Sequence, residues 1–193
     1  MKLKGSKTMK NLMTAFAGEC QAAMRYMYFA KTADKEGFVQ ISRIFEETMR
    51  NEQAHAKRLF KYLNEELKGE EVEIEAAYPV QLGNTKENLE SAYKGENFEA
   101  EKMYPEFAKI AEEEGFKEIS HTFTEIGEAE EAHEARYRKL HDNIVNDRVF
   151  KREEKVKWLC LNCGYIHEGK EAPEKCPACD HPKKYFELFV ENY

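Results

Sequence analysis

Two short motifs combine side chains that can bind metal ions. Glu52 and His55 lie three residues apart, and Glu130 and His133 repeat that spacing. On an α-helix, residues i and i+3 lie on one face, one turn apart, so each motif presents a carboxylate and an imidazole together. Both groups are ligands for divalent first-row metals. The two motifs therefore suggest a site for two metal ions, which would need carboxylates from other helices.

The surroundings of the candidate glutamates distinguish a metal site from an ordinary helix surface. A glutamate on a helix is usually solvated, and a lone histidine more often has a structural role. Glu19, Glu52, Glu96 and Glu130, however, each have apolar neighbours at spacings of three, four and seven. Burying four carboxylates without cations would be very costly. We therefore favour a metal site over a core histidine or a surface cluster.

An internal repeat relates the two halves of the helical region. Glu36-Gly37-Phe38 recurs as Glu114-Gly115-Phe116, at an offset of 78 residues that the two metal-binding motifs share. Gly18-Glu19 recurs as Gly95-Glu96, at an offset of 77. One extra residue therefore lies in the second half, and we place it near Pro105. A proline inside a helix removes a hydrogen bond and favours a kink or π-bulge.

The elements that position these residues are predicted to be long helices. Apolar periodicity predicts helices over residues 8–36, 38–66, 85–114 and 116–146. If a two-fold axis relates the two hairpins, the four glutamates lie at one level and the turns at opposite ends. The connector, residues 67–84, must then cross roughly 40 Å, and 18 residues can span about 60 Å. The prediction is an all-α four-helix bundle with a long crossover, the architecture of ferritin-like di-metal proteins.

Three further residues are expected around the metals. Glu99 is a spare carboxylate, because its counterpart in the first half is Ala22. The charges of four glutamates balance those of two divalent ions. If the ions are iron, oxidation of both from Fe(II) to Fe(III) adds two positive charges. We therefore expect Glu99 and His55 to serve the same iron in different oxidation states. Tyr26 and Tyr104 are candidate hydrogen-bond donors to the carboxylates, although simple core packing explains them equally well.

The C-terminal region carries a second candidate metal site. Two C-x-x-C pairs lie 12 residues apart and predict a tetrahedral site for zinc or iron; they are Cys160, Cys163, Cys176 and Cys179. We expect a small metal-bound β module over residues 151–193, after a helical domain over residues 1–150. A module of this size needs its metal to fold.

Composition narrows the possible partners. The net charge of −7 argues against nucleic-acid binding. No apolar run is long enough for a signal peptide or a membrane span. We therefore expect a cytoplasmic protein with no membrane partner.

The motifs resemble rubrerythrin over essentially the whole chain, down to the rubredoxin-like segment C-x-x-C-G-Y…C-P-x-C. The resemblance implies a di-iron centre in the bundle, one iron on the four cysteines, and a head-to-tail homodimer. The implied activity is reduction of hydrogen peroxide to water in oxidative-stress defence. The implied di-iron ligands are Glu19, Glu52, His55, Glu96, Glu99, Glu130 and His133. Asp180-His181 departs from stand-alone rubredoxins, in which a Gly usually follows the last cysteine.

Electrons are expected from NAD(P)H through a separate reductase or a rubredoxin, because the chain has no Gly-rich dinucleotide fingerprint. The main alternative is a ferroxidase, an iron-storage protein or an oxygen-reducing di-iron protein, none of which needs the cysteine-rich tail. An interaction protein with zinc in the tail is a second alternative. The ligand types alone also permit manganese in the bundle.

Overall fold

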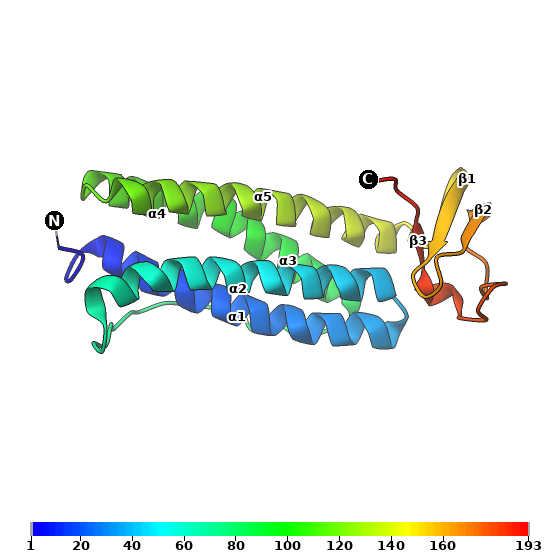
Figure 1. The fold of residues 1–193 in the computed structure, drawn as a ribbon, viewed down its shortest axis with the longest axis horizontal. Coiled ribbons are helices and arrows are strands. Elements are labelled where there is room, and N and C mark those ends of the chain that lie inside the picture. The colour runs from blue at the N-terminus through cyan, green and yellow to red at the C-terminus, as the bar shows by residue number, and fades with distance from the viewer. Residues whose placement is uncertain (1, 193) are drawn as a thin grey trace.

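The computed structural model describes residues 2–192 and contains two antiparallel helical hairpins followed by a small sheet (Figure 1). The first hairpin pairs α1 (Lys7–Glu36) with α2 (Val39–Leu67), and the second pairs α3 (Thr85–Phe98), the π-helix η1 (Glu99–Met103) and α4 (Tyr104–Glu113) with α5 (Lys117–Val145). Gly37 and Gly115 make the tight turns at φ values of 89° and 80°. Glycine adopts this left-handed conformation at no steric cost.

The crossover connects the two hairpins along the length of the bundle. Residues 68–84 contain no helix or strand and run beside α1, so that the two glycine turns lie at opposite ends (Figure 1). Glu114 accepts hydrogen bonds from the backbone N–H groups of Lys7 and Thr8 at the start of α1. Glu36, its counterpart in the repeat, accepts one from the backbone of Thr85 at the start of α3. Each hairpin therefore caps the first helix of the other, and the predicted crossover is confirmed.

The π-helix η1 accommodates the extra residue of the second half. The helix predicted over residues 85–114 is divided into α3, η1 and α4, and Pro105 lies in the first turn of α4. Proline has no N–H to donate to the carbonyl four residues before it, and a π-bulge absorbs one additional residue. The bulge is therefore just N-terminal to Pro105, and Glu99 is its first residue.

Two apolar layers fill the bundle. One contains Leu12, Leu59 and Phe123; the other contains Phe29 and Phe45. The buried glutamates lie between these layers in all four long helices of the repeat. The glutamates thus lie between two layers of buried apolar side chains.

The C-terminal module packs against the end of the bundle that contains Gly37 (Figure 1). Its strands, in the order β2 (Ile166–Glu171), β1 (Lys151–Cys160) and β3 (Phe186–Leu188), form an antiparallel sheet, with a 3₁₀ turn, η2 (Lys183–Tyr185), before β3. The aromatic rings of Phe38 and Phe150 stack at 6.3 Å, and the Lys184 ammonium lies 3.2 Å from Asp34. β1 begins at Lys151; the division into domains at that point stays a prediction.

Across residues 2–192, no helix combines the length and the apolar character needed to cross a membrane.

Candidate metal centres

Six side chains from four helices meet at the middle of the bundle. Their potential ligand atoms form two groups, and within each group all atoms lie within 4.8 Å of one another. The first group is Glu19, Glu52, His55 and Glu130; the second is Glu52, Glu96, Glu130 and His133. Glu52 and Glu130 belong to both groups. Such an arrangement could hold two adjacent cations, with Glu52 and Glu130 shared and with one further glutamate and one histidine for each cation.

The two histidines lie in matching positions. The Nδ1 atom of His55 is 3.0 Å from Glu130 and 3.3 Å from Glu52. The Nδ1 atom of His133 is 2.7 Å from Glu130 and 3.2 Å from Glu52. The two-fold repeat seen in the sequence thus extends to the atoms that face the site.

The electrostatics of the cluster show that it needs positive charge. Burial and repulsion from neighbouring carboxylates raise the pKa of Glu19 and Glu96 well above the usual range. Burial opposes the charge on His55, but the carboxylates of Glu130, Glu19 and Glu52, which lie 3.0–3.6 Å from its Nδ1 atom, outweigh it and raise the pKa to about 12. The same balance raises the pKa of His133 to about 9. Burial also opposes ionisation of Glu52, but the imidazoles of His133 and His55, at 3.2 and 3.3 Å, outweigh it and lower its pKa to about 2.

Several buried polar atoms of the cluster have no hydrogen bond of good geometry in the described part of the chain. They are Glu19 Oε2, both carboxylate oxygens of Glu52, His55 Nδ1, Glu96 Oε2 and Glu130 Oε1. Buried polar atoms without partners are rare in folded proteins and cost free energy. Two bound cations would use these atoms, so the residues present fit a di-metal centre.

Two tyrosines hold the outer glutamates in place. Tyr26 of α1 donates a hydrogen bond to Glu96 of α3, and Tyr104 of α4 donates one to Glu19 of α1. Both tyrosines are buried. Each phenol therefore reaches from one hairpin to the glutamate of the other and fixes one of its oxygens, which leaves the second oxygen for the site.

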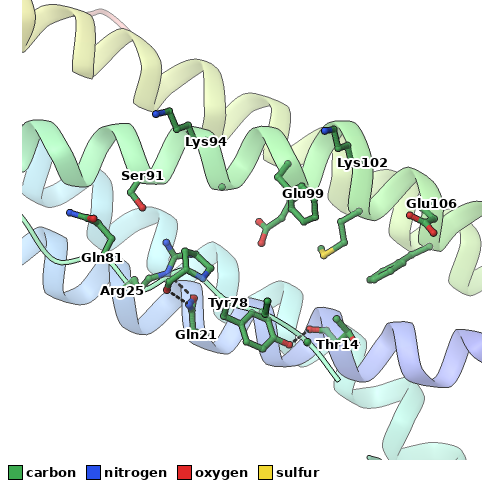
Figure 2. A pocket seen from close by; sticks show the side chains of 18 of the residues that line it. Thr14, Gln21, Arg25, Tyr78, Gln81, Ser91, Lys94, Glu99, Lys102 and Glu106 are labelled. Atoms are coloured by element: carbon green, nitrogen blue, oxygen red, sulfur yellow. Dashed lines mark hydrogen bonds between the residues drawn. The ribbon is translucent and has the colours of Figure 1, made fainter. Parts of the chain in front are cut away.

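Glu99 lies beside the cluster but in neither ligand group of the described residues. Its side chain points from η1 into a cavity between α1, the crossover and α3–α4 (Figure 2). Burial, followed by repulsion from Glu130 and Glu52, raises its pKa to about 8. Arg25, which lines the same cavity, was not predicted as a site residue. The one sequence feature that could have identified Arg25 is its charge, because it directly precedes Tyr26 in an otherwise apolar stretch.

The four cysteines of the C-terminal module also meet at one point. Their Sγ atoms lie within 4.8 Å of one another, with Cys160–Cys179 at 3.8 Å and Cys163–Cys176 at 3.6 Å. None of these four cysteines is in a disulfide. A tetrahedral metal with bonds of about 2.3 Å to sulfur needs sulfurs roughly 3.8 Å apart. The donor set therefore fits one metal ion with no open position.

Two similar turns present the cysteine pairs. The backbone N–H of Gly164 donates to Cys160 O, and that of Asp180 donates to Cys176 O. Gly164 and Asp180 both have left-handed backbone conformations, with φ values of 78° and 59°. Aspartate tolerates this conformation better than most residues, so Asp180 supports the turn that glycine makes in the first pair. The backbone N–H of His181 lowers the pKa of Cys179 to about 6, which favours the thiolate that binds metal.

Comparisons with known proteins agree across both parts of the chain. The family model described as Rubrerythrin matches residues 10–141, and the model described as Rubrerythrin, rubredoxin-like domain, matches residues 158–187. Rubrerythrin of Clostridium perfringens is 57% identical over 192 residues, covering 99% of this chain and 98% of that protein. Rubrerythrin of Nitratidesulfovibrio vulgaris is 54% identical over the same length and the same shares.

A solved structure of fully reduced, all-ferrous nigerythrin is 36% identical, with a TM-score of 0.64 over 97% of this chain and 92% of that one. The helical region therefore has the ferritin-like fold that was predicted. Its Glu/His cluster is a di-iron carboxylate site, and the four cysteines form a rubredoxin-like iron site. Agreement of this extent over nearly the full length shows that the chain belongs to the rubrerythrin family.

Proposed function

We propose that this protein is a peroxidase that reduces hydrogen peroxide to water and receives its electrons through the four-cysteine iron site. One observation carries the proposal: a single chain combines a di-iron centre with a second metal site whose positions are all filled by thiolates. A site without an open position cannot bind substrate, but it can pass electrons. A ferroxidase or storage protein has no need for such a tail.

The protein residues hold and orient the reacting centre. When bound, the two irons supply one electron each toward breaking the O–O bond. Glu52 and Glu130 would each hold both irons, because each belongs to both groups of potential ligand atoms. Tyr26 and Tyr104 restrain the outer glutamates, and such supporting hydrogen bonds tune ligand orientation.

The position of Glu99 supports its predicted exchange with His55. Glu99 stands outside both ligand groups, while its carboxylate lies near enough to be influenced by Glu130 and Glu52. His55 belongs to the first group. This arrangement fits a carboxylate that joins one iron only when the site carries more positive charge. Structures of the reduced and oxidised protein with the same ligand set would contradict the exchange.

The electron supply involves partners. We propose an external donor, a reductase linked to NAD(P)H or a rubredoxin, and a head-to-tail homodimer. The module contacts the Gly37 end of the bundle (Figure 1). Glu52 is 15 residues beyond that turn, which corresponds to about 22 Å along α2. A tail that serves the di-iron site of a partner subunit avoids this separation. We also expect the protein to act in the cytoplasm.

Reoxidation of the anaerobically reduced protein tests the proposed function. The fully reduced, iron-loaded protein is mixed with hydrogen peroxide or with oxygen, and the visible absorbance of the ferric thiolate site is followed. The expected result is a rapid return of colour that is faster with peroxide. A Glu52→Ala/Glu130→Ala variant keeps the four cysteines and should regain colour at least tenfold more slowly. Faster return with oxygen would instead favour an oxidase or ferroxidase, and a colourless protein would point to zinc in the tail.

A further inference from the structure

A cavity of about 970 Å³ lies beside the di-iron cluster, between α1, the crossover and α3–α4. Its walls include apolar side chains from the crossover, among them Ala77 and Tyr78, and from α3–α4, among them Phe98, Met103 and Phe107, whereas α1 contributes Thr14, Gly18, Gln21 and Arg25. The crossover wall is fixed to α1, because Tyr78 donates a hydrogen bond to Thr14 O and Gln21 donates one to Pro79 O. Glu99 projects into the same space (Figure 2). The cavity is therefore a built feature that adjoins the redox centre.

Hydrogen peroxide does not account for a space of this size and character. Two water-sized groups occupy roughly 60 Å³, whereas cavities of about 300–1,000 Å³ with mostly apolar walls are typical of sites for small organic molecules. The volume and the walls thus suit a substrate with an apolar body.

Arg25 gives the cavity a polar anchor. Its side chain is only 8% exposed, and its Nε–H donates to Gln21 Oε1 at 2.7 Å. Its Nη1 atom is buried without a hydrogen-bond partner, and no ion pair joins Arg25 to a carboxylate within residues 2–192. An unpaired buried guanidinium is costly, and it binds carboxylates well through two parallel hydrogen bonds. The other cations on the wall are Lys94, which pairs with Glu90 at 2.5 Å, and Lys102, which is exposed.

We propose that this cavity binds organic hydroperoxides that carry a carboxylate, such as fatty-acid hydroperoxides, and that the protein reduces them at the di-iron site. The carboxylate pairs with Arg25, the apolar chain lies along the cavity wall, and the hydroperoxide group reaches the cluster beside Glu99. Arg25 and Glu99 come from opposite walls of the cavity (Figure 2), and the charge of Arg25 partly offsets the burial and the repulsion that raise the pKa of Glu99.

This inference rests on the proposed peroxidase function and extends its substrate class. The reaction is R–OOH plus two electrons and two protons, giving R–OH and water. The O–O bond breaks, each of two ferrous ions loses one electron, and the protons come from solvent through the open side of the cavity. The four-cysteine site and the external donor then return the two electrons.

The test compares three oxidants with the reduced, iron-loaded protein: hydrogen peroxide, cumene hydroperoxide and the 13-hydroperoxide of linoleic acid. The measured quantity is the ratio of the rate constant for the acidic hydroperoxide to that for hydrogen peroxide. Arg25→Gln should lower this ratio at least tenfold, and Arg25→Lys should restore most of it. Gly95→Leu should also lower it at least tenfold, because a Cβ at Gly95 meets open space in the cavity wall. Cumene hydroperoxide, which lacks a carboxylate, should respond to Gly95→Leu but not to Arg25→Gln.

A matched control removes a guanidinium elsewhere. Arg138 is exposed and pairs with Glu134 on the outer surface, so Arg138→Gln should leave the ratio within twofold. Linoleate lacks a hydroperoxide group, so its binding can be measured by calorimetry without turnover. Its affinity should fall at least tenfold in Arg25→Gln.

Two results would overturn the inference. One is rapid reduction of hydrogen peroxide with less than 1% of that rate for the acidic hydroperoxide. The other is a ratio that neither Arg25→Gln nor Gly95→Leu changes. If no peroxide is reduced, the proposed function itself fails, and the substrate inference fails with it; linoleate binding then separately shows whether the cavity holds an amphipathic acid.

Discussion

At the residue scale, the central feature is an excess of buried carboxylates that two histidines alone cannot balance. Glu19, Glu52, Glu96 and Glu130 are all buried. Burial and repulsion from the neighbouring carboxylates raise the pKa values of Glu19 and Glu96, so that without metal these groups hold protons that lower the negative charge. Metal ions compete with these protons for the same oxygens, so metal affinity, protonation and stability are coupled at this site.

The metal-free protein should lose stability as the pH rises from 6 to 9. The pKa is raised to about 8 for Glu99 and to about 9 for His133. Groups with a raised pKa bind protons more tightly in the folded chain, so the stability linked to those protons disappears as the pH rises through these values. We expect a decrease in Tm of at least about 4 °C, or about 1–2 kcal/mol. Calorimetry of the metal-free and iron-loaded forms measures it.

The iron-loaded protein provides the comparison for this pH dependence. Its Tm should stay level or rise over the same range, because deprotonation favours metal binding. Glu99→Gln should make the Tm of the metal-free protein less dependent on pH between pH 6 and 8. A metal-free protein that is equally stable at pH 6 and pH 9 would contradict the electrostatic account.

Removal of the supporting phenols should weaken the site without unfolding it. We expect Tyr26→Phe and Tyr104→Phe each to reduce iron affinity or peroxide turnover about tenfold, because the outer glutamates lose their fixed orientation. Tyr137→Phe is the matched control, since Tyr137 is also buried but donates no hydrogen bond to a glutamate of the described chain. Iron titration and reoxidation kinetics measure the effect. Equal losses in all three variants would indicate a general packing role instead.

At the element scale, the π-helix reconciles a two-fold site with unequal halves. Tyr26 follows Glu19 by seven residues, whereas Tyr104 follows Glu96 by eight. Both tyrosines nevertheless make equivalent hydrogen bonds across the bundle. The wider turn of η1 takes up the additional residue between Glu96 and Tyr104. The half with the bulge is also the half with the spare carboxylate, Glu99.

The caps between the hairpins should contribute measurably and unequally to stability. Glu114 accepts hydrogen bonds from the backbones of Lys7 and Thr8 and from the Thr8 hydroxyl, at 2.6–3.0 Å. Glu36 accepts one at 2.8 Å. We expect Glu114→Ala to lower the free energy of unfolding by about 1–2 kcal/mol and Glu36→Ala by about 0.5–1 kcal/mol. Urea denaturation of the iron-loaded protein measures both.

Glu112→Ala is the control for the caps. Glu112 is exposed in the same turn of α4, and its replacement should change stability by less than about 0.5 kcal/mol. If Glu114→Ala behaves like Glu112→Ala, the contact between the hairpin ends does not stabilise the bundle.

At the scale of the whole molecule, the chain separates its two metal sites. The module packs on the Gly37 end through the Phe38–Phe150 stack and the Lys184–Asp34 pair. The di-iron cluster lies at the middle of the helices, between two apolar layers. This separation within one chain is the reason to expect electron transfer between subunits.

Mixed dimers test transfer between subunits. One subunit carries Glu52→Ala and Glu130→Ala, and the other ends after residue 150. In such a dimer, the only di-iron site belongs to one subunit and the only four-cysteine site belongs to the other. We expect about half of the peroxidase activity of the intact dimer. Each parent variant alone should be inactive with the external donor. Inactive mixed dimers, at full iron content, would assign electron transfer to sites within one chain.

Much of this protein could be predicted from local sequence alone. Apolar periodicity identified the helices, and Gly37 and Gly115 identified the turns between them. The 78-residue repeat predicted that the glutamates lie at one level. The crossover followed from the length of the connector. These features depend on backbone conformation and on residues a few positions apart, so the sequence records them directly.

The tertiary structure alone decided which residues meet across the bundle. It assigned Glu52 and Glu130 to both ligand groups, left Glu99 outside them, and brought Arg25 to the cavity wall. These contacts depend on how each helix is rotated about its axis and on where the π-bulge absorbs its extra residue. Both are set by the packing of side chains far apart in the sequence, and no local pattern carries that information.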